Sequence, residues 1–450
     1  IKIDVSGNME MKAGSAIRAE NLLGGGNGGN IMITVGGNLT LRGGAPGALI
    51  SSSKNAGAGD TGRAGNVTLN VTGNVVQEPG SNVLANANGP AGAIEITGNI
   101  ITIDGLVSSR GGTTIGRGGP ITVDAECDLT ISDTGVVSSR GLDPGADRVH
   151  LEGGCAVRIF GLVESTGPGH GPLPGANLCH APQRPDKPLN STACVEVWAG
   201  DSLTIDSVSL SNGQISADTA QSGGVAGRGW IDLFARGDIL INGDTSGPFA
   251  VHANQLLGNG RGGLVTVKSI ENQVLATGRA IQANDTAAGG RGGVGNVEAK
   301  LDTDLIGGTL EAKGSTGGGN PDGGDITVRS FNGSVDSDAA SLINVTGGYP
   351  SPEGSITLTA CGAIGFPPGA TTPVAPTKNT GVCGGAPLLP LEVTPGDGKS
   401  YVKLPVCKCA GVCINPLVSD KVRQSCGDPP VFPCTVGFAN EAELRGLCFP

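Results

Sequence analysis

One stretch of the chain is repeated almost unchanged directly after itself, and this repetition limits the fold more than any other feature. Residues 94–120, IEITGNIITIDGLVSSRGGTTIGRGGP, are followed by a similar copy over residues 121–148. Each copy holds three short runs of alternating apolar residues, and in the first copy these are separated by a Gly-Asn turn, an Asp-Gly turn and a Gly-rich connection. Runs of this length and period are typical of β-strands and are too short for helices.

The first of these runs recurs along most of the chain. Its predicted start positions are Ile1, Ile31, Val67, Ile94, Ile121, Val149, Val195, Ile231, Val265, Val297, Ile326 and Ile356. The spacing averages about 32 residues, which is typical of stacked repeat proteins.

The third run of each repeat pairs a branched aliphatic residue with a small one two positions later. The pairs are Ile17/Ala19, Ile50/Ser52, Val107/Ser109, Val137/Ser139, Val163/Ser165, Ile215/Ala217, Val251/Ala253, Ile281/Ala283 and Leu310/Ala312. Such a column of Ala and Ser predicts a narrow inner corner. Successive repeats must then stack, with each strand paired about 4.8 Å from its equivalent one repeat further on. This arrangement is a parallel β-helix.

The Gly-Gly-Asn turns and the Leu-Thr-Leu or Ile-Thr-Ile runs, as at 39–41 and 101–103, resemble the right-handed β-helical passengers of secreted bacterial adhesins, the filamentous-haemagglutinin-like group. The resemblance implies an all-β fold: a right-handed single-stranded parallel β-helix, or solenoid, of about 11 coils over residues 1–366. Residues 167–194 form a Pro-rich excursion from it, and residues 367–450 form a Pro/Cys-rich C-terminal module or extended arm. Related coils also carry polysaccharide lyases and phage tailspikes, so the resemblance indicates architecture more than function.

Charge and hydropathy exclude some classes of partner. The net charge of −11 argues against a nucleic-acid partner. The chain has no apolar run of about 18 residues, so we expect no membrane span. It begins with Ile1 inside a predicted strand, which we expect of a processed or truncated form.

The 12 cysteines predict an oxidising compartment, and therefore an extracellular or cell-surface protein. We expect Cys127 to pair with Cys155, because both lie six residues after a strand start; buried free thiols are the alternative. By proximity we expect two further bonds and pairing among the six remaining tail cysteines, namely Cys179 with Cys194, Cys361 with Cys383, and Cys407, Cys409, Cys413, Cys426, Cys434 and Cys448 among themselves. The CKCAGVC segment lacks a Cys-x-x-Cys pair and a companion His, so we expect no metal and no cofactor.

Two acidic pairs on neighbouring coils define the alternative of a glycan-cleaving enzyme, namely Asp124 with Glu152 and Glu196 with Asp232. Glycosidases use two carboxyl groups as acid and as base or nucleophile. No Arg, Tyr or His cluster is expected beside either pair, so we predict that the protein is not an enzyme.

Other side chains are candidates for contacts with glycans. Trp198 and Phe234 occupy equivalent positions and form either a sugar-stacking platform or an apolar interface. Asn190, in the excursion, is the best candidate for glycosylation.

The sequence therefore predicts an extracellular structural protein: a filament-forming or surface-layer subunit, or an adhesin, with surface glycans as partners. The apolar stretches 387–393 and 400–406 favour head-to-tail self-association, in which either adds as a strand to the open edge of the next subunit. Folding of the tail back over the last coil of its own chain, at Ile356, is the alternative. A β-helical carbohydrate-active enzyme, a polysaccharide lyase or glycoside hydrolase, is the rival function.

Overall fold

The computed structural model describes most of residues 1–409. Within that range it leaves out residues 22–25, 55–61, 113–115, 142–147, 168–192, 209–212, 221–228, 258–259, 287–288, 316–321, 349–352, 368–370, 373, 388–390, 394–398, 402–403 and 408. The predicted sites Asn190, Cys179, Cys413, Cys426, Cys434 and Cys448 lie outside the described residues.

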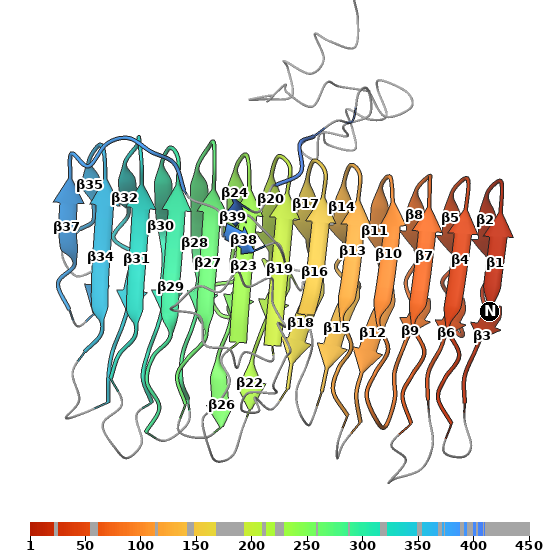
Figure 1. Cartoon of the computed structure of the whole chain (residues 1–450). Coiled ribbons are helices and arrows are strands. Elements are labelled where there is room, and N and C mark those ends of the chain that lie inside the picture. Colours follow the sequence, from red (N-terminus) through yellow and green to blue (C-terminus); the bar gives the residue numbers. More distant parts are fainter. Residues whose placement is uncertain are drawn as a thin grey trace, which may run out of the picture.

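The described chain is all-β, and its strands stack in parallel into an elongated rod that we call the solenoid (Figure 1). Three columns of strands run along it. The first column is a 13-stranded sheet of β1 (Lys2–Val5), β4 (Ile31–Val35), β7 (Val67–Val71), β10 (Ile94–Gly98), β13 (Ile121–Ala125), β16 (Arg148–Gly153), β19 (Ala193–Ala199), β23 (Gly229–Ala235), β27 (Leu264–Ser269), β29 (Val294–Ala299), β31 (Asp325–Ser330), β34 (Ser355–Ala360) and β37 (Thr377–Thr380).

The other two columns belong to a second large sheet. The second column contains β2 (Met9–Met11), β5 (Leu39–Leu41), β8 (Val75–Gln77), β11 (Ile101–Ile103), β14 (Leu129–Ile131), β17 (Val157–Ile159), β20 (Leu203–Asp206), β24 (Ile239–Asn242), β28 (Val274–Gln282), β30 (Thr303–Glu311), β32 (Val335–Ser337) and β35 (Ile364–Gly365). The third contains β3 (Ala16–Arg18), β6 (Leu49–Ser51), β9 (Asn82–Leu84), β12 (Leu106–Arg110), β15 (Val136–Arg140), β18 (Leu162–Thr166), β21 (Gln214–Ser216), β25 (Val251–His252), the second halves of β28 and β30, β33 (Leu342–Asn344) and β36 (Thr371–Thr372).

Two short pairs complete the described strands. A parallel pair joins β22 (Thr219–Ala220) to β26 (Gln255–Leu257). An antiparallel pair in the tail joins β38 (Leu391–Val393) to β39 (Lys399–Tyr401).

The registers confirm the repeat assignment at every predicted start except one. Val297 was wrong as a start, because Val265 pairs with Gly295, while Val297 pairs with Val267 two positions on. Gly295 has no side chain, so nothing in the sequence marks it as the core-facing position.

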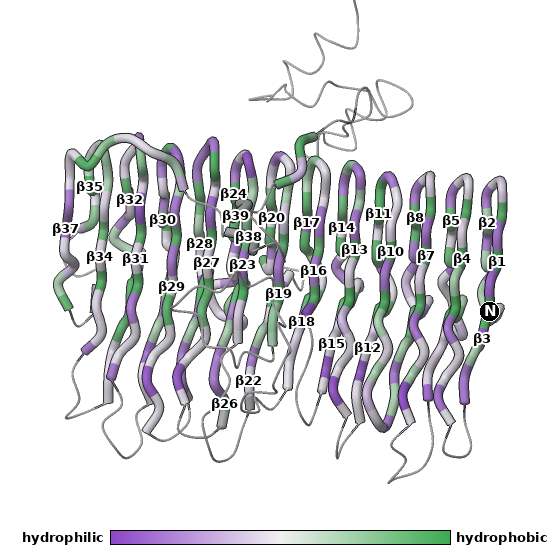
Figure 2. Tube along the Cα trace, viewed as in Figure 1, coloured by the Kyte–Doolittle hydropathy of each residue, from purple (hydrophilic) through white to green (hydrophobic). Residues whose placement is uncertain are grey.

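Apolar side chains from all three columns meet inside the solenoid and form one continuous core. Figure 2 shows hydrophobic positions recurring along successive strands. The predicted column of small residues lies at the corner of this core, where Ser139 and Ala253 are fully buried. The Ser139 hydroxyl donates to the Gly119 carbonyl at 2.9 Å, and the Gly263 amide donates to the Ala253 carbonyl at 2.8 Å. The glycine-rich entry to the next first-column strand thus lies directly against the small residue, and a larger side chain has no room there.

The stack extends beyond the boundary expected at residue 366, since β36 and β37 pair in parallel with β33 and β34. The chain then reverses and runs back over the turns between the first and second columns. We call residues 381–385, 404–407 and 409 the strap. In its first part Cys383 is bonded to Cys361, as predicted, and Lys300 Nζ donates to the Gly385 carbonyl at 2.5 Å.

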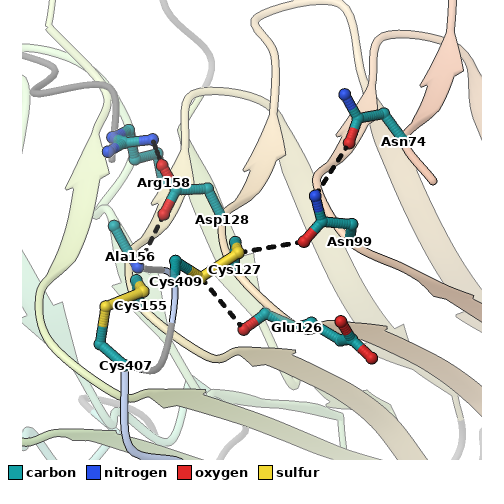
Figure 3. The surroundings of a disulfide bond; sticks show 10 residues. All are labelled: Asn74, Asn99, Glu126, Cys127, Asp128, Cys155, Ala156, Arg158, Cys407 and Cys409. Atoms are coloured by element: carbon teal, nitrogen blue, oxygen red, sulfur yellow. Dashed lines mark hydrogen bonds and ion pairs between the residues drawn. A yellow bond between two sulfur atoms is a disulfide. The ribbon is translucent and has the colours of Figure 1, made fainter. Parts of the chain in front are cut away.

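The second part of the strap is bonded to coils in the middle of the solenoid (Figure 3). Cys155 is bonded to Cys407, and Cys127 to Cys409. Arg236 donates from Nε to the Pro405 carbonyl at 2.9 Å. The strap therefore passes from later to earlier coils.

These bonds correct the disulfide prediction: the pairing of Cys127 with Cys155 and the pairing of Cys407 and Cys409 within the tail were both wrong. In-register side chains on adjacent coils are parallel and about 4.8 Å apart, whereas the two Cβ atoms of a disulfide approach to about 3.8 Å. Cys407 and Cys409 instead bond separately to the two cysteines of successive coils. Cys194 is also disulfide-bonded.

Replacing Ala253 by Val should lower the free energy of unfolding by about 1–3 kcal/mol, because the added methyl groups meet the Gly263 backbone. Ala16→Val is the matched control: it makes the same change at an exposed position of β3 and should change stability by less than about 0.5 kcal/mol. Urea unfolding followed by circular dichroism measures both. Equal effects of the two substitutions would contradict the narrow corner.

Replacing Cys407 and Cys409 together by Ser should destabilise the protein more than replacing Cys361 and Cys383. The strap bonds span 252 and 282 residues against 22 for the other bond. The chain-entropy model gives about 2 kcal/mol more for the first strap bond, and the second bond, which then closes a loop of only about 30 residues, contributes about as much as the 22-residue bond. Thermal unfolding under non-reducing conditions compares the two double variants. An equal fall in unfolding temperature for the two double variants would show that the strap does not restrain the coils beneath it.

Candidate functional site

The two predicted acidic pairs lie on the outward face of the first column. Asp124 pairs in register with Glu152, and Glu196 with Asp232. Glu196 and Asp232 are only 1% and 3% exposed, so solvent does not reach the second pair. The first pair is accessible, because Asp124 is exposed and the Glu152 side chain is 26% exposed.

Basic side chains converge on these carboxylates, contrary to the expectation from sequence. His150 Nε2 lies 3.3 Å from Glu152, and His150 Nδ1 lies 3.3 Å from Glu196. Arg148 Nη2 lies 2.6 Å from Glu196. The alternation of β16 places Arg148, His150 and Glu152 on one face, beside Glu196 on β19.

This arrangement shifts two pKa values upward. Partial burial, followed by repulsion from Glu152, raises the pKa of Asp124. Burial acts to lower the pKa of His150, but hydrogen bonds with Glu152 and Glu196 outweigh it and raise the pKa overall. The cluster thus combines a carboxyl group and a buried imidazole that both have raised pKa values and therefore hold their protons more firmly.

Trp198 and Phe234 are neighbours in register, as the repeat predicts. Phe234 is 1% exposed, and the Trp198 ring packs edge-on against the His150 ring with centroids 4.7 Å apart. Both aromatic groups therefore pack within the structure, and Phe234 offers no open face for a sugar ring.

A groove of about 700 Å³ lies on another side of the solenoid, over the third column, and we call it the side groove. It crosses β12, β15, β18, β21 and β25, and its lining is Arg110, Gly111, Arg140, Gly141, Leu162, Glu164, Thr166, Gly167, Gln214, Ser216, Asp218, His252 and Leu256. Four steps between strands give it a span of about 19 Å. Its volume is typical of small-molecule sites.

Charged side chains hold one another in place along the groove. Arg140 lies 3.0 Å from Glu164, whose Oε1 also accepts from the Ser138 hydroxyl at 2.6 Å. Further along, His252 Nδ1 lies 3.0 Å from Asp218. An ionised carboxylate only accepts, so His252 carries its proton on Nδ1 and Nε2 remains for another contact.

Sequence reasoning missed the side groove because its residues come from five repeats and are separated by long loops. One signal was present: Ser-Ser-Arg occurs twice, and the register stacks Arg110 on Arg140. Two like charges on adjacent coils repel each other and destabilise the fold unless a carboxylate or an anionic ligand lies between them.

The chain matches no family model, no curated protein and no solved structure. Among the residues that the structure describes, no helix is long and apolar enough to cross a membrane.

The raised pKa of His150 predicts a pH-dependent stability. The folded state favours the protonated imidazole, so this contribution is present below about pH 6.5 and is lost as the pH rises through the folded pKa. The His150→Gln protein should have a lower free energy of unfolding than the original protein at low pH. Its free energy of unfolding should also decline less as the pH rises. Urea midpoints from about pH 6 to pH 9 measure the slope. Parallel profiles for the two proteins would contradict the assignment.

Proposed function

We propose that the protein is an extracellular structural protein of the adhesin type: a right-handed parallel β-helix of about 11 coils that displays binding surfaces on its sides. Surface glycans are the proposed partners. The observation that carries the proposal is the strap, whose two disulfides connect the tail to coils 252 and 282 residues earlier.

Such cross-links suit a protein that works outside the cell. Disulfides persist in oxidising compartments, and they stabilise a fold mainly by restricting the unfolded chain. The strap lies on one side of the solenoid and leaves the side groove accessible on another. Binding sites on a rigid scaffold keep their geometry, as adhesion requires.

The proposal does not include fibre formation through the tail strands. The stretches expected to add to a neighbouring subunit contain β38 and β39, which pair with each other. Cys407 and Cys409, directly after the second stretch, are bonded to coils of the same chain. The tail thus folds back on its own chain, but over coils in the middle of the solenoid and not over the last coil at Ile356 as the alternative expected.

A carbohydrate-active enzyme is the second candidate, and the accessible pair of Asp124 and Glu152 favours it. Adjacent strands place these residues about 5 Å apart, similar to the separation of the two carboxyl groups in retaining glycosidases. The raised pKa of Asp124 suits a general acid. We prefer the structural function because the second predicted pair is buried.

A cleavage assay separates the two functions. Polygalacturonate, alginate, hyaluronan and dextran are incubated with the protein, and their size distributions are followed by gel filtration. We expect no change with any of them. Shortening that disappears in both Asp124→Asn and Glu152→Gln would overturn the structural proposal. Asp4→Asn, an exposed carboxylate on β1 of the same column, is the matched control.

A further inference from the structure

We propose that the side groove binds an oligosaccharide that carries a single carboxylate at one end and neutral hydroxylated sugars along the rest. The ligand lies along the solenoid axis with its acidic end at Arg110. This inference deepens the proposed adhesive function and rests on it.

The Arg110 end of the groove supplies a guanidinium that is not already paired. Arg140, its neighbour in register, is engaged by Glu164 and donates from Nε to the Thr166 hydroxyl at 3.2 Å. Arg110 is exposed, and within the described part of the chain its guanidinium has no ion-pair or hydrogen-bond partner. A planar guanidinium at the end of a groove suits two parallel hydrogen bonds to a carboxylate.

The other end supplies groups that recognise hydroxyls. Asp218 is an acceptor, although it already receives the Asn254 amide at 2.7 Å and lies 3.0 Å from His252. The side chains of Asp218 and His252 are both 15% exposed, so each keeps a surface toward the groove. Ser216, between Glu164 and His252 in register, has a hydroxyl without a hydrogen-bond partner among the described residues. Sugar hydroxyls both donate and accept, and they match this mixture.

Two leucines give the groove apolar surface. Leu162 is partly buried in β18, and Leu256 is 43% exposed in β26. A lone exposed leucine is ordinary, but here it lines a groove that also contains Leu162 and several charged and hydroxyl groups. The apolar faces of sugar rings can lie against these side chains while the ring hydroxyls reach the polar groups.

The charge distribution selects among acidic saccharides. Arg110 and Arg140 lie toward one end, and Glu164 and Asp218 lie on later strands. A polymer with a carboxylate on every sugar would place negative charge beside both carboxylates, which is unfavourable. A saccharide with one terminal carboxylate avoids this repulsion and still pairs with Arg110.

Binding of 3′-sialyllactose, which has one terminal carboxylate, is compared with binding of lactose by isothermal titration calorimetry. We expect the intact protein to bind 3′-sialyllactose at least about tenfold more tightly, as one charge-assisted contact provides. Arg110→Ala should remove this preference without changing the affinity for lactose. Leu256→Glu should weaken binding of both sugars.

Arg18→Ala is the matched control. Arg18 is an exposed arginine on β3 of the same column, outside the groove, so its removal should leave both affinities unchanged. Circular dichroism confirms that each variant is folded. Absence of binding by the intact protein, equal affinity for the two sugars, or tighter binding of polygalacturonate would overturn the groove assignment.

The same samples test the proposed function separately. Mass spectrometry of the recovered sugar should show it intact. Cleavage of 3′-sialyllactose by the intact protein would overturn the structural function while supporting the groove as a binding site. If the intact protein neither binds nor cleaves 3′-sialyllactose, the assignment of the groove as a binding site is overturned, and the proposed structural function is not.

Discussion

The structure depends on parallel pairing of each strand with its equivalent one coil along. This pairing satisfies backbone amides and carbonyls between coils, so the hydrogen bonds that hold the rod together run along its axis. Any residue repeated at one place in the sequence becomes a column in space. The aliphatic columns form the core, and the Ala and Ser column forms a corner against the glycine-rich loops.

Stacking also determines what the outer faces can do. Side chains on adjacent coils are held about 4.8 Å apart, within reach of ion pairs and hydrogen bonds. On the first column this produces the network of His150, Glu152 and Glu196, and on the third column it produces the side groove. The two sites differ in access: Glu196 and His150 are buried, whereas Arg110 and Leu256 are exposed.

The strap adds contacts that the repeat does not contain. Local stacking connects each coil only to its neighbours. The bonds from Cys407 and Cys409 connect the tail to coils far earlier in the chain. Arg236 holds the strap at Pro405, two residues before the first of these cysteines. At the crossing, a Cβ at Gly200 would lie 1.9 Å from the Gly154 carbonyl oxygen and 2.9 Å from the Pro405 carbonyl oxygen, so the glycine makes room for both the preceding coil and the strap.

The sequence by itself determined the strands, their parallel stacking and nearly every register, because these follow from a short pattern repeated at one place in each coil. It also placed Asp124 beside Glu152 and Trp198 beside Phe234. The register failed only at Gly295, which lacks the side chain that marks the pattern. The tertiary structure decided the partners of Cys127 and Cys155, the burial of Glu196 and the existence of the side groove. Each of these depends on groups brought together from distant repeats or from the tail, and no local periodicity records such contacts.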